Sequence, residues 1–184
     1  MDELLKDSER KMKASIDHLH QEFGKVRTGR ASVALVEDLK VEFYGNPTPL
    51  NQTATLSTPD SRTISIAPWD PSLLPVIEKA IAASDLGLNP SNDGKVIRLN
   101  IPPLTTERRQ QMTKVVRKYA EEGKVAIRNI RRDFNDKIKA MEKDGDISKD
   151  DEKRGHDLIQ KMTDKYVEEV DKITAGKEKD VMEE

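Results

Sequence analysis

The sequence predicts an α+β fold: an elongated antiparallel three-helix bundle built from both chain ends, with a small β/α/β domain inserted between them. All nine prolines lie between Pro47 and Pro103, and proline breaks a helix interior at a cost of roughly 3 kcal/mol. The flanks outside that stretch lack proline, are rich in charge and carry apolar residues at helical spacing. They can therefore form long helices around a segment that cannot.

Composition excludes several classes of protein. Charged residues make up 36% of the 184 residues, against about 25% in an ordinary globular domain, which suits long helices that each bury one apolar stripe. The absence of cysteine rules out disulfides and thiolate metal sites. No apolar run approaches the ~20 residues of a membrane span, and the amino end lacks the apolar core of a signal peptide. We therefore expect a soluble, cytoplasmic protein that does not contact membranes.

Three runs of apolar residues recur at steps of three and four, the pattern of a helix with one buried face. They are Leu5 to Val26, Val116 to Met141 and Ile159 to Ile173. The connector Glu142–Ser148 is short, which predicts that the second and third helices are antiparallel neighbours. Ser148 with Asp151 resembles a capping box that starts the third helix. The second helix, from about Thr106 to Glu142, would be on the order of 55 Å long.

The middle of the chain alternates in hydrophobicity as β-strands do. Strand patterns cover residues 39–44, 63–66 and 97–101, and residues 53–56 are a further candidate. A short helix is expected to open at Asp70, with Pro75 in its first turn, where no N–H donor is needed. Gly87 is expected to end this helix. Trp69 is expected to pack inside the small domain, with a recognition surface as the alternative.

The bundle is assigned to residues 1–29 and 105–184, and the small domain to residues 30–104. The junctions that join them have the composition of a two-stranded hinge. Gly29 can adopt dihedral angles that other residues avoid, whereas Pro102 and Pro103 favour a stiff, extended chain. Thr105 or Thr106 can cap the helix that follows. A moving hinge and a pair of rigid linkers both remain open.

Charge is distributed unevenly along the chain. Residues 108–139 carry 11 basic and 4 acidic groups, a net +7, whereas residues 142–184 carry 9 and 15, a net −6. At about 100° per residue, a cationic stripe lies roughly a quarter turn from the apolar face of the second helix and is expected to face solvent. Its members are Arg117, Lys124, Arg128, Arg131 and Lys139, with Arg132 at its edge.

This stripe spans several phosphates of a nucleic-acid backbone, and arginine suits bidentate phosphate contacts. The competing interpretation is a solvated helix face, paired with acids of the third helix such as Asp157, Asp164 and Glu168. The residues alone leave both open. Aromatic residues are 4% of the chain, so a bound nucleic acid would be recognised by its backbone and shape rather than by base stacking.

Patterns typical of catalysis or metal binding are missing. His18 and His20 are two residues apart and point in different directions on a helix, whereas metal pairs favour i, i+4 spacing. The sequence holds no P-loop, dinucleotide-binding glycine pattern or nucleophile elbow. We expect no catalytic residue, no metal and no cofactor. A helical nucleic-acid-binding or chaperone-like adaptor, and more weakly a metal-dependent hydrolase using clustered acids, remain as alternatives.

Motifs spread in order along nearly the whole chain resemble those of the bacterial ribosome recycling factor family. They are RTGRAS at residues 27–32, FYG at 43–45, DSRT at 60–63, SDLGLNP at 84–90, IPPLT at 101–105, RNIRRD at 128–133 and KDG at 143–145. The resemblance implies an L-shaped molecule of near-tRNA size with a flexible hinge, which itself hydrolyses nothing. It also implies action with elongation factor G and its GTP, which together dissociate the post-termination 70S ribosome into subunits and release it from mRNA.

The resemblance further implies which residues do this work, in a factor expected to be a monomer. The bundle would lie on large-subunit rRNA across the A and P sites. The rRNA-binding residues would be Arg27 and Arg30 at the hinge and Arg128, Arg131 and Arg132 in the long helix, to which the stripe adds Arg117 and Lys124. The hinge would consist of Thr28, Gly29, Ala31, Ile101, Pro102, Pro103, Leu104 and Thr105.

Overall fold

The computed structural model describes residues 1–183, and this part of the chain divides into two units. The helical unit combines Met1–Phe23 with Gln110–Glu183, and the sheet unit is Gly24–Arg109. The first turn of the long second helix therefore belongs to the sheet unit. Glu184, the last residue of the predicted bundle, lies outside the described residues. No helix within residues 1–183 is both long enough and apolar enough to span a membrane.

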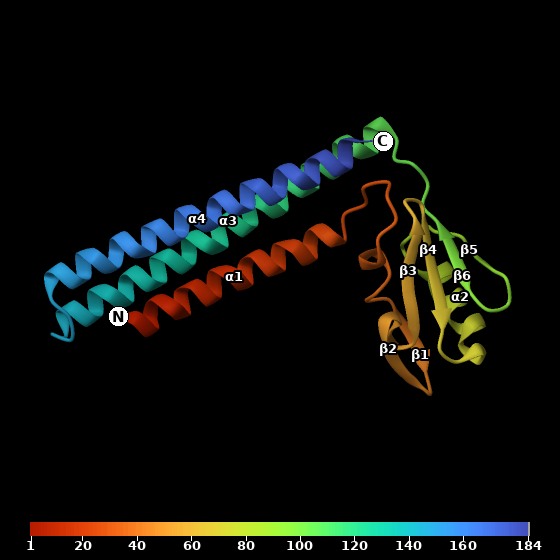
Figure 1. Cartoon of the computed structure of the whole chain (residues 1–184), viewed down its shortest axis with the longest axis horizontal. Coiled ribbons are helices and arrows are strands. Elements are labelled where there is room, and N and C mark those ends of the chain that lie inside the picture. Colours follow the sequence, from red (N-terminus) through yellow and green to blue (C-terminus); the bar gives the residue numbers. More distant parts are fainter. Residues whose placement is uncertain (184) are drawn as a thin grey trace. The chain divides into compact units, whose positions relative to one another are not determined.

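Within residues 1–183, three long helices form the bundle: α1 (Asp2–Gly24), α3 (Thr106–Lys143) and α4 (Lys149–Met182). They lie side by side in Figure 1. The 38 residues of α3 span about 57 Å at 1.5 Å per residue. Most of the apolar residues at helical spacing are buried, as the pattern predicts; they include Met12, Ile16, Leu19, Phe23, Val116, Ile127, Phe134, Ile138, Ile159, Tyr166 and Val170. Phe23 and Phe134, which lie within two of the apolar runs, are therefore core residues.

Side chains cap the first turns of α3 and α4 where the sequence predicts. The Ser148 hydroxyl accepts a hydrogen bond from the Asp151 N–H at 3.0 Å and donates to the Asp151 carboxylate at 2.9 Å. This confirms the cap, although the return bond joins the two side chains instead of reaching the Ser148 backbone. Thr105, rather than Thr106, caps α3, because its hydroxyl accepts the Arg108 N–H at 3.2 Å.

The sheet unit packs two antiparallel sheets and one helix, α2 (Leu74–Ala83), around a single core. Its strands are β1 (Lys40–Phe43), β2 (Asn46–Pro49), β3 (Ala54–Asp60), β4 (Thr63–Pro68), β5 (Pro90–Asn92) and β6 (Ile97–Asn100). β1 pairs with β2, and the other four follow the order β3-β4-β6-β5. Ile77 and Ile81 of α2 are fully buried in the same core as Ile64 and Ile66 of β4. The fold class is therefore α+β, as predicted.

Two of these strands, β2 and β5, escape the sequence pattern because they are short and contain no apolar residue other than proline. Pro47 and Pro49 are two residues apart on β2, so both positions that lack an N–H fall on the same side of an edge strand. Pro90 likewise lies on β5, at the edge of the larger sheet. Edge strands tolerate proline because one row of their backbone groups has no partner strand.

Two expectations about the sheet unit are wrong. Gly87 does not end helix α2, because the helix ends at Ala83 with Ser84 as its C-cap, and Gly87 lies in the turn beyond with a φ of +63°. The expectation that Trp69 packs inside the small domain is wrong as well, because 63% of this residue is exposed. The start of the helical segment is confirmed: the Asp70 carboxylate accepts the Ser72 N–H at 3.0 Å, and Pro75 lies in the first turn of α2.

Candidate nucleic-acid interface

The cationic stripe on α3 begins with two residues that are paired to acids of α4. Arg117 donates through Nε to Glu178 Oε1 at 2.7 Å, and this carboxylate raises the pKa of the guanidinium. Lys124 Nζ lies 2.5 Å from Asp171 Oδ1, and only 22% of the lysine side chain is exposed. The expectation that the whole stripe faces solvent is therefore wrong for Lys124, which lies along the α3–α4 contact.

The antiparallel register of the two helices explains these pairs. Seven residues along α3, from Arg117 to Lys124, correspond to seven residues back along α4, from Glu178 to Asp171. A seven-residue step returns to nearly the same side of a helix, so cations at this spacing repeatedly meet acids at the same spacing. Charged residues that flank a helix–helix seam commonly form such pairs.

One further step leads to Arg131, whose surroundings differ. Its Nη1 donates to the neutral amide oxygen of Gln160 at 3.3 Å, and the Gln160 amide nitrogen donates to Asp164 at 2.8 Å. The acid suggested by the sequence therefore lies one side chain away from the arginine. Another suggested acid, Glu168, pairs instead with Lys172 at 3.0 Å on its own helix.

The stripe becomes less neutralised towards the end of α3. Arg128 reaches Glu121 on its own helix at 3.4 Å and keeps 43% of its side chain exposed. Arg132 and Lys139 are exposed, and neither shows an ion pair or hydrogen bond to any side chain among residues 1–183. Because exposed ion pairs contribute roughly 0–1 kcal/mol, the Arg128 pair can be exchanged for a phosphate. We call Arg128, Arg131 and Arg132 the arginine cluster.

The other two predicted arginines, Arg27 and Arg30, belong to the sheet unit, whereas the cluster on α3 belongs to the helical unit. Arg27 is half-buried and Arg30 is exposed. The Arg30 N–H lies 3.4 Å from the Thr28 hydroxyl, which accepts a hydrogen bond from it.

The two linkers lie against each other at Gly29 and Leu104. Gly29 has a φ of +79°, and a Cβ built there would lie 3.6 Å from the Leu104 backbone nitrogen. The neighbouring predicted hinge residues are tied to the β3–β4 turn: Ala31 donates its N–H to Ser61 at 2.7 Å, and Ile101 donates to Arg62 at 2.7 Å. The other predicted hinge residues, Thr28, Gly29 and Pro102 to Thr105, form no such backbone hydrogen bond to the sheet.

Two prominent surface residues are Tyr44 and Trp69, which are 80% and 63% exposed. The sequence reasoning missed Tyr44 and gave a surface position for Trp69 only as the alternative. A composition of few aromatic residues gave no signal that these two would lie outside the core. Among residues 1–183, no group of three or more histidine or acidic side chains is arranged to hold a metal ion.

Comparisons with known proteins agree with one another over nearly the whole chain. The family model described as "Ribosome recycling factor" matches residues 3–182. A ribosome-recycling factor of Oleidesulfovibrio alaskensis is 55% identical over 183 residues, with 100% of both chains covered. One from Legionella pneumophila is 52% identical, covering 100% of this chain and 99% of the relative.

Two solved structures extend the similarity to three dimensions. The solution structure of a ribosome recycling factor has a TM-score of 0.76 and 42% identity, covering 98% of this chain and 96% of its own. In the second structure, the ribosome recycling factor of T. thermophilus and the elongation factor G of E. coli are bound to the E. coli post-termination complex. That recycling factor has a TM-score of 0.69 and 47% identity, covering 99% of this chain and 98% of its own.

Proposed function

This chain belongs to the ribosome recycling factor family, and on that premise we propose that it splits the post-termination ribosome into subunits together with elongation factor G and GTP. The family consists of non-enzymatic translation factors, so the chain's part is mechanical. GTP is used by the partner, and the chain acts as a monomer in the cytoplasm with no cofactor of its own. The T. thermophilus relative bound with elongation factor G to a post-termination complex supports both partners.

The arginine cluster anchors the bundle to large-subunit rRNA, across the A and P sites. Its three guanidinium groups lie within five residues of one rigid helix, and none is held by an acid of α4. Guanidinium groups form two parallel hydrogen bonds with phosphate, and this binding weakens steeply with salt. Arg117 and Lys124 contribute less, because their α4 carboxylates already compensate their charge.

Force enters through the sheet unit and reaches the bundle through the two linkers. Because Ala31 and Ile101 are hydrogen-bonded to the β3–β4 turn, they move with the sheet. The change of angle is therefore absorbed by Thr28, Gly29 and Pro102 to Thr105, a short hinge of the kind used in domain motion. The continuous helix α3 carries the force onward to the rRNA.

The deciding experiment reverses the charge of Arg131. Arg131→Glu is expected to retain the helical circular dichroism of the wild type, since only a hydrogen bond to Gln160 is lost. Subunit splitting, followed by light scattering with elongation factor G and GTP, is expected to be abolished. Lys6→Glu makes the same charge change at an exposed position of α1 and is expected to split ribosomes at the wild-type rate.

Three outcomes would count against this proposal. Normal splitting by the Arg131→Glu variant would remove the arginine cluster from the mechanism. Equal loss in the Lys6→Glu variant would show that net charge, rather than this surface, determines activity. Wild-type protein that leaves post-termination ribosomes intact in the presence of elongation factor G and GTP would refute the function itself.

A further inference from the structure

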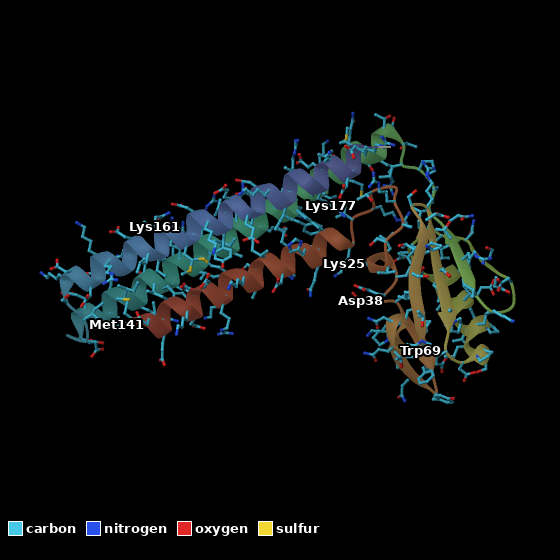
Figure 2. All side chains as sticks on the ribbon, viewed as in Figure 1. Lys25, Asp38, Trp69, Met141, Lys161 and Lys177 are labelled. Carbon is cyan, nitrogen blue, oxygen red and sulfur yellow. The ribbon has the colours of Figure 1, made fainter. Side chains whose placement is uncertain are left out.

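The sheet unit exposes two aromatic side chains that are each linked to the same acidic residue. Tyr44 and Trp69 are 80% and 63% exposed, more than any other large hydrophobic residue in residues 1–183. Asp70 joins them, because it follows Trp69 in the chain and its carboxylate accepts a hydrogen bond from the Tyr44 hydroxyl at 3.4 Å. Figure 2 labels Trp69 at the end of the unit where the β1–β2 hairpin lies. We call Tyr44 and Trp69 the aromatic patch.

The backbone at Tyr44 is unfavourable for a tyrosine. Tyr44 has a φ of +46°, the only positive φ of a non-glycine residue among residues 1–183, and Gly45 follows at +79°. Two positive φ values in a two-residue hairpin turn define type I′, which favours asparagine followed by glycine. An edge-on contact between the Tyr44 and Phe43 rings, with centroids 4.5 Å apart, offsets part of the free-energy cost of this backbone conformation. It does not bury the ring, so folding alone does not explain an aromatic residue here.

Trp69 is held in one orientation although it is exposed. Its indole N–H donates to the Thr55 hydroxyl at 2.9 Å, and its backbone N–H donates to Thr53 at 3.1 Å. An exposed indole that is already oriented loses little conformational entropy when a partner covers it. Tryptophan and tyrosine are also the residues most enriched at the centres of protein interfaces.

We propose that the aromatic patch and the Asp70 carboxylate form a docking surface for a protein partner that places a lysine or arginine side chain against the two rings. Cations are attracted to the faces of tyrosine and tryptophan rings, and the adjacent carboxylate completes the charge complementarity. This inference rests on the proposed function, because the partner is then the GTPase that acts on the sheet unit.

The local charge favours protein over RNA as the occupant. Hydrogen bonds from Ser72 hold the pKa of Asp70 below its ordinary value, so the carboxylate is ionised at neutral pH. Glu42, two residues before Tyr44, is exposed as well. Phosphate groups are repelled by two carboxylates, whereas a basic protein surface is attracted to them.

The test uses three variants in the full chain and one control. Tyr44→Asn places the residue preferred by the turn and is expected to preserve or raise stability. Trp69→Ala removes the second ring. Asp70→Asn removes the charge but keeps an oxygen that can accept the Ser72 N–H. Lys95→Ala, at an exposed position in the β5–β6 connection of the same unit, is the matched control.

Splitting rates are measured against the concentration of elongation factor G, and ribosome binding is measured without it. Tyr44→Asn and Trp69→Ala are expected to raise the half-saturating concentration of elongation factor G about tenfold, and Asp70→Asn roughly threefold. Ribosome affinity without the GTPase, and all properties of Lys95→Ala, are expected to match the wild type.

Each other outcome overturns the inference. Unchanged half-saturation by all three variants, with normal wild-type splitting, removes the docking surface and leaves the proposed function standing. Weaker ribosome binding without the GTPase identifies the patch as an RNA contact. If the wild type itself does not split ribosomes, the proposed function fails, and this inference fails with it.

Discussion

The two units use their aromatic residues in opposite ways. In the helical unit, Phe23, Phe134 and Tyr166 are at most 3% exposed and fill the seam between helices. In the sheet unit, residues 24–109, the fourteen buried residues of the core include no aromatic side chain. Phe43 packs against this core only partly buried, and Tyr44 and Trp69 lie on the surface. The surfaces differ accordingly: the bundle offers guanidinium groups suited to a polyanion, and the sheet unit offers rings and a carboxylate suited to a protein.

The comparison extends to the cores. All fourteen buried residues of the aliphatic cluster belong to the sheet unit, whereas Phe134, Ile138 and Ile159 form a separate cluster in the bundle. A unit with its own core can in principle fold alone. A polar contact also joins α4 to α1 in the bundle, because the Tyr166 hydroxyl donates a hydrogen bond to the Glu9 carboxylate at 3.0 Å.

The largest expected effect separates the two cores. Phe134→Ala leaves a cavity beside Ile138 and Ile159 and is expected to destabilise the bundle by about 3 to 5 kcal/mol. Urea unfolding followed by circular dichroism reports the helices, and fluorescence of Trp69, the single tryptophan, reports the sheet unit. We expect the circular dichroism transition to move to lower urea while the fluorescence transition stays in place. Equal shifts in both signals would show that the units unfold together.

The second prediction sharpens the contrast within the cationic stripe. Arg132→Gln is expected to weaken ribosome binding roughly tenfold and to lower the salt slope by about one, as the loss of a phosphate contact should. Arg117→Gln is expected to change binding much less, because Glu178 already holds that guanidinium. Co-sedimentation at several salt concentrations measures both. A stronger effect from Arg117 would show that its ion pair opens on the ribosome.

A third expected effect is a loss of bundle stability in alkali. Burial, with the Glu9 carboxylate, raises the pKa of Tyr166 from 10.0 to about 12. The folded bundle therefore holds this proton more tightly than the unfolded chain, so the contribution is complete below pH 10 and is lost as the pH rises towards 12. Melting temperatures by circular dichroism between pH 9 and 12 test this. Tyr166→Phe, which cannot ionise, should show a shallower decline, and an identical decline would contradict the assignment.

Local patterns in the sequence determined much of this protein. Proline placement separated the helical flanks from the inserted segment, apolar spacing identified the buried face of each long helix, and Ser148 marked the start of α4. These features depend on a few neighbouring residues, so they can be read without knowing the rest of the fold. The motifs between residues 27 and 145 also identified the family.

Tertiary structure decided what depends on residues far apart in the chain. The antiparallel register brought Arg117 and Lys124 to acids of α4 that the sequence did not single out. Pairing with β1 and β6 made strands of two proline-containing segments, β2 and β5. An aliphatic core that closes without Trp69 left its indole on the surface. Each outcome depends on which segment packs next to the residue in question. The spacing of residues along one segment does not identify that neighbouring segment.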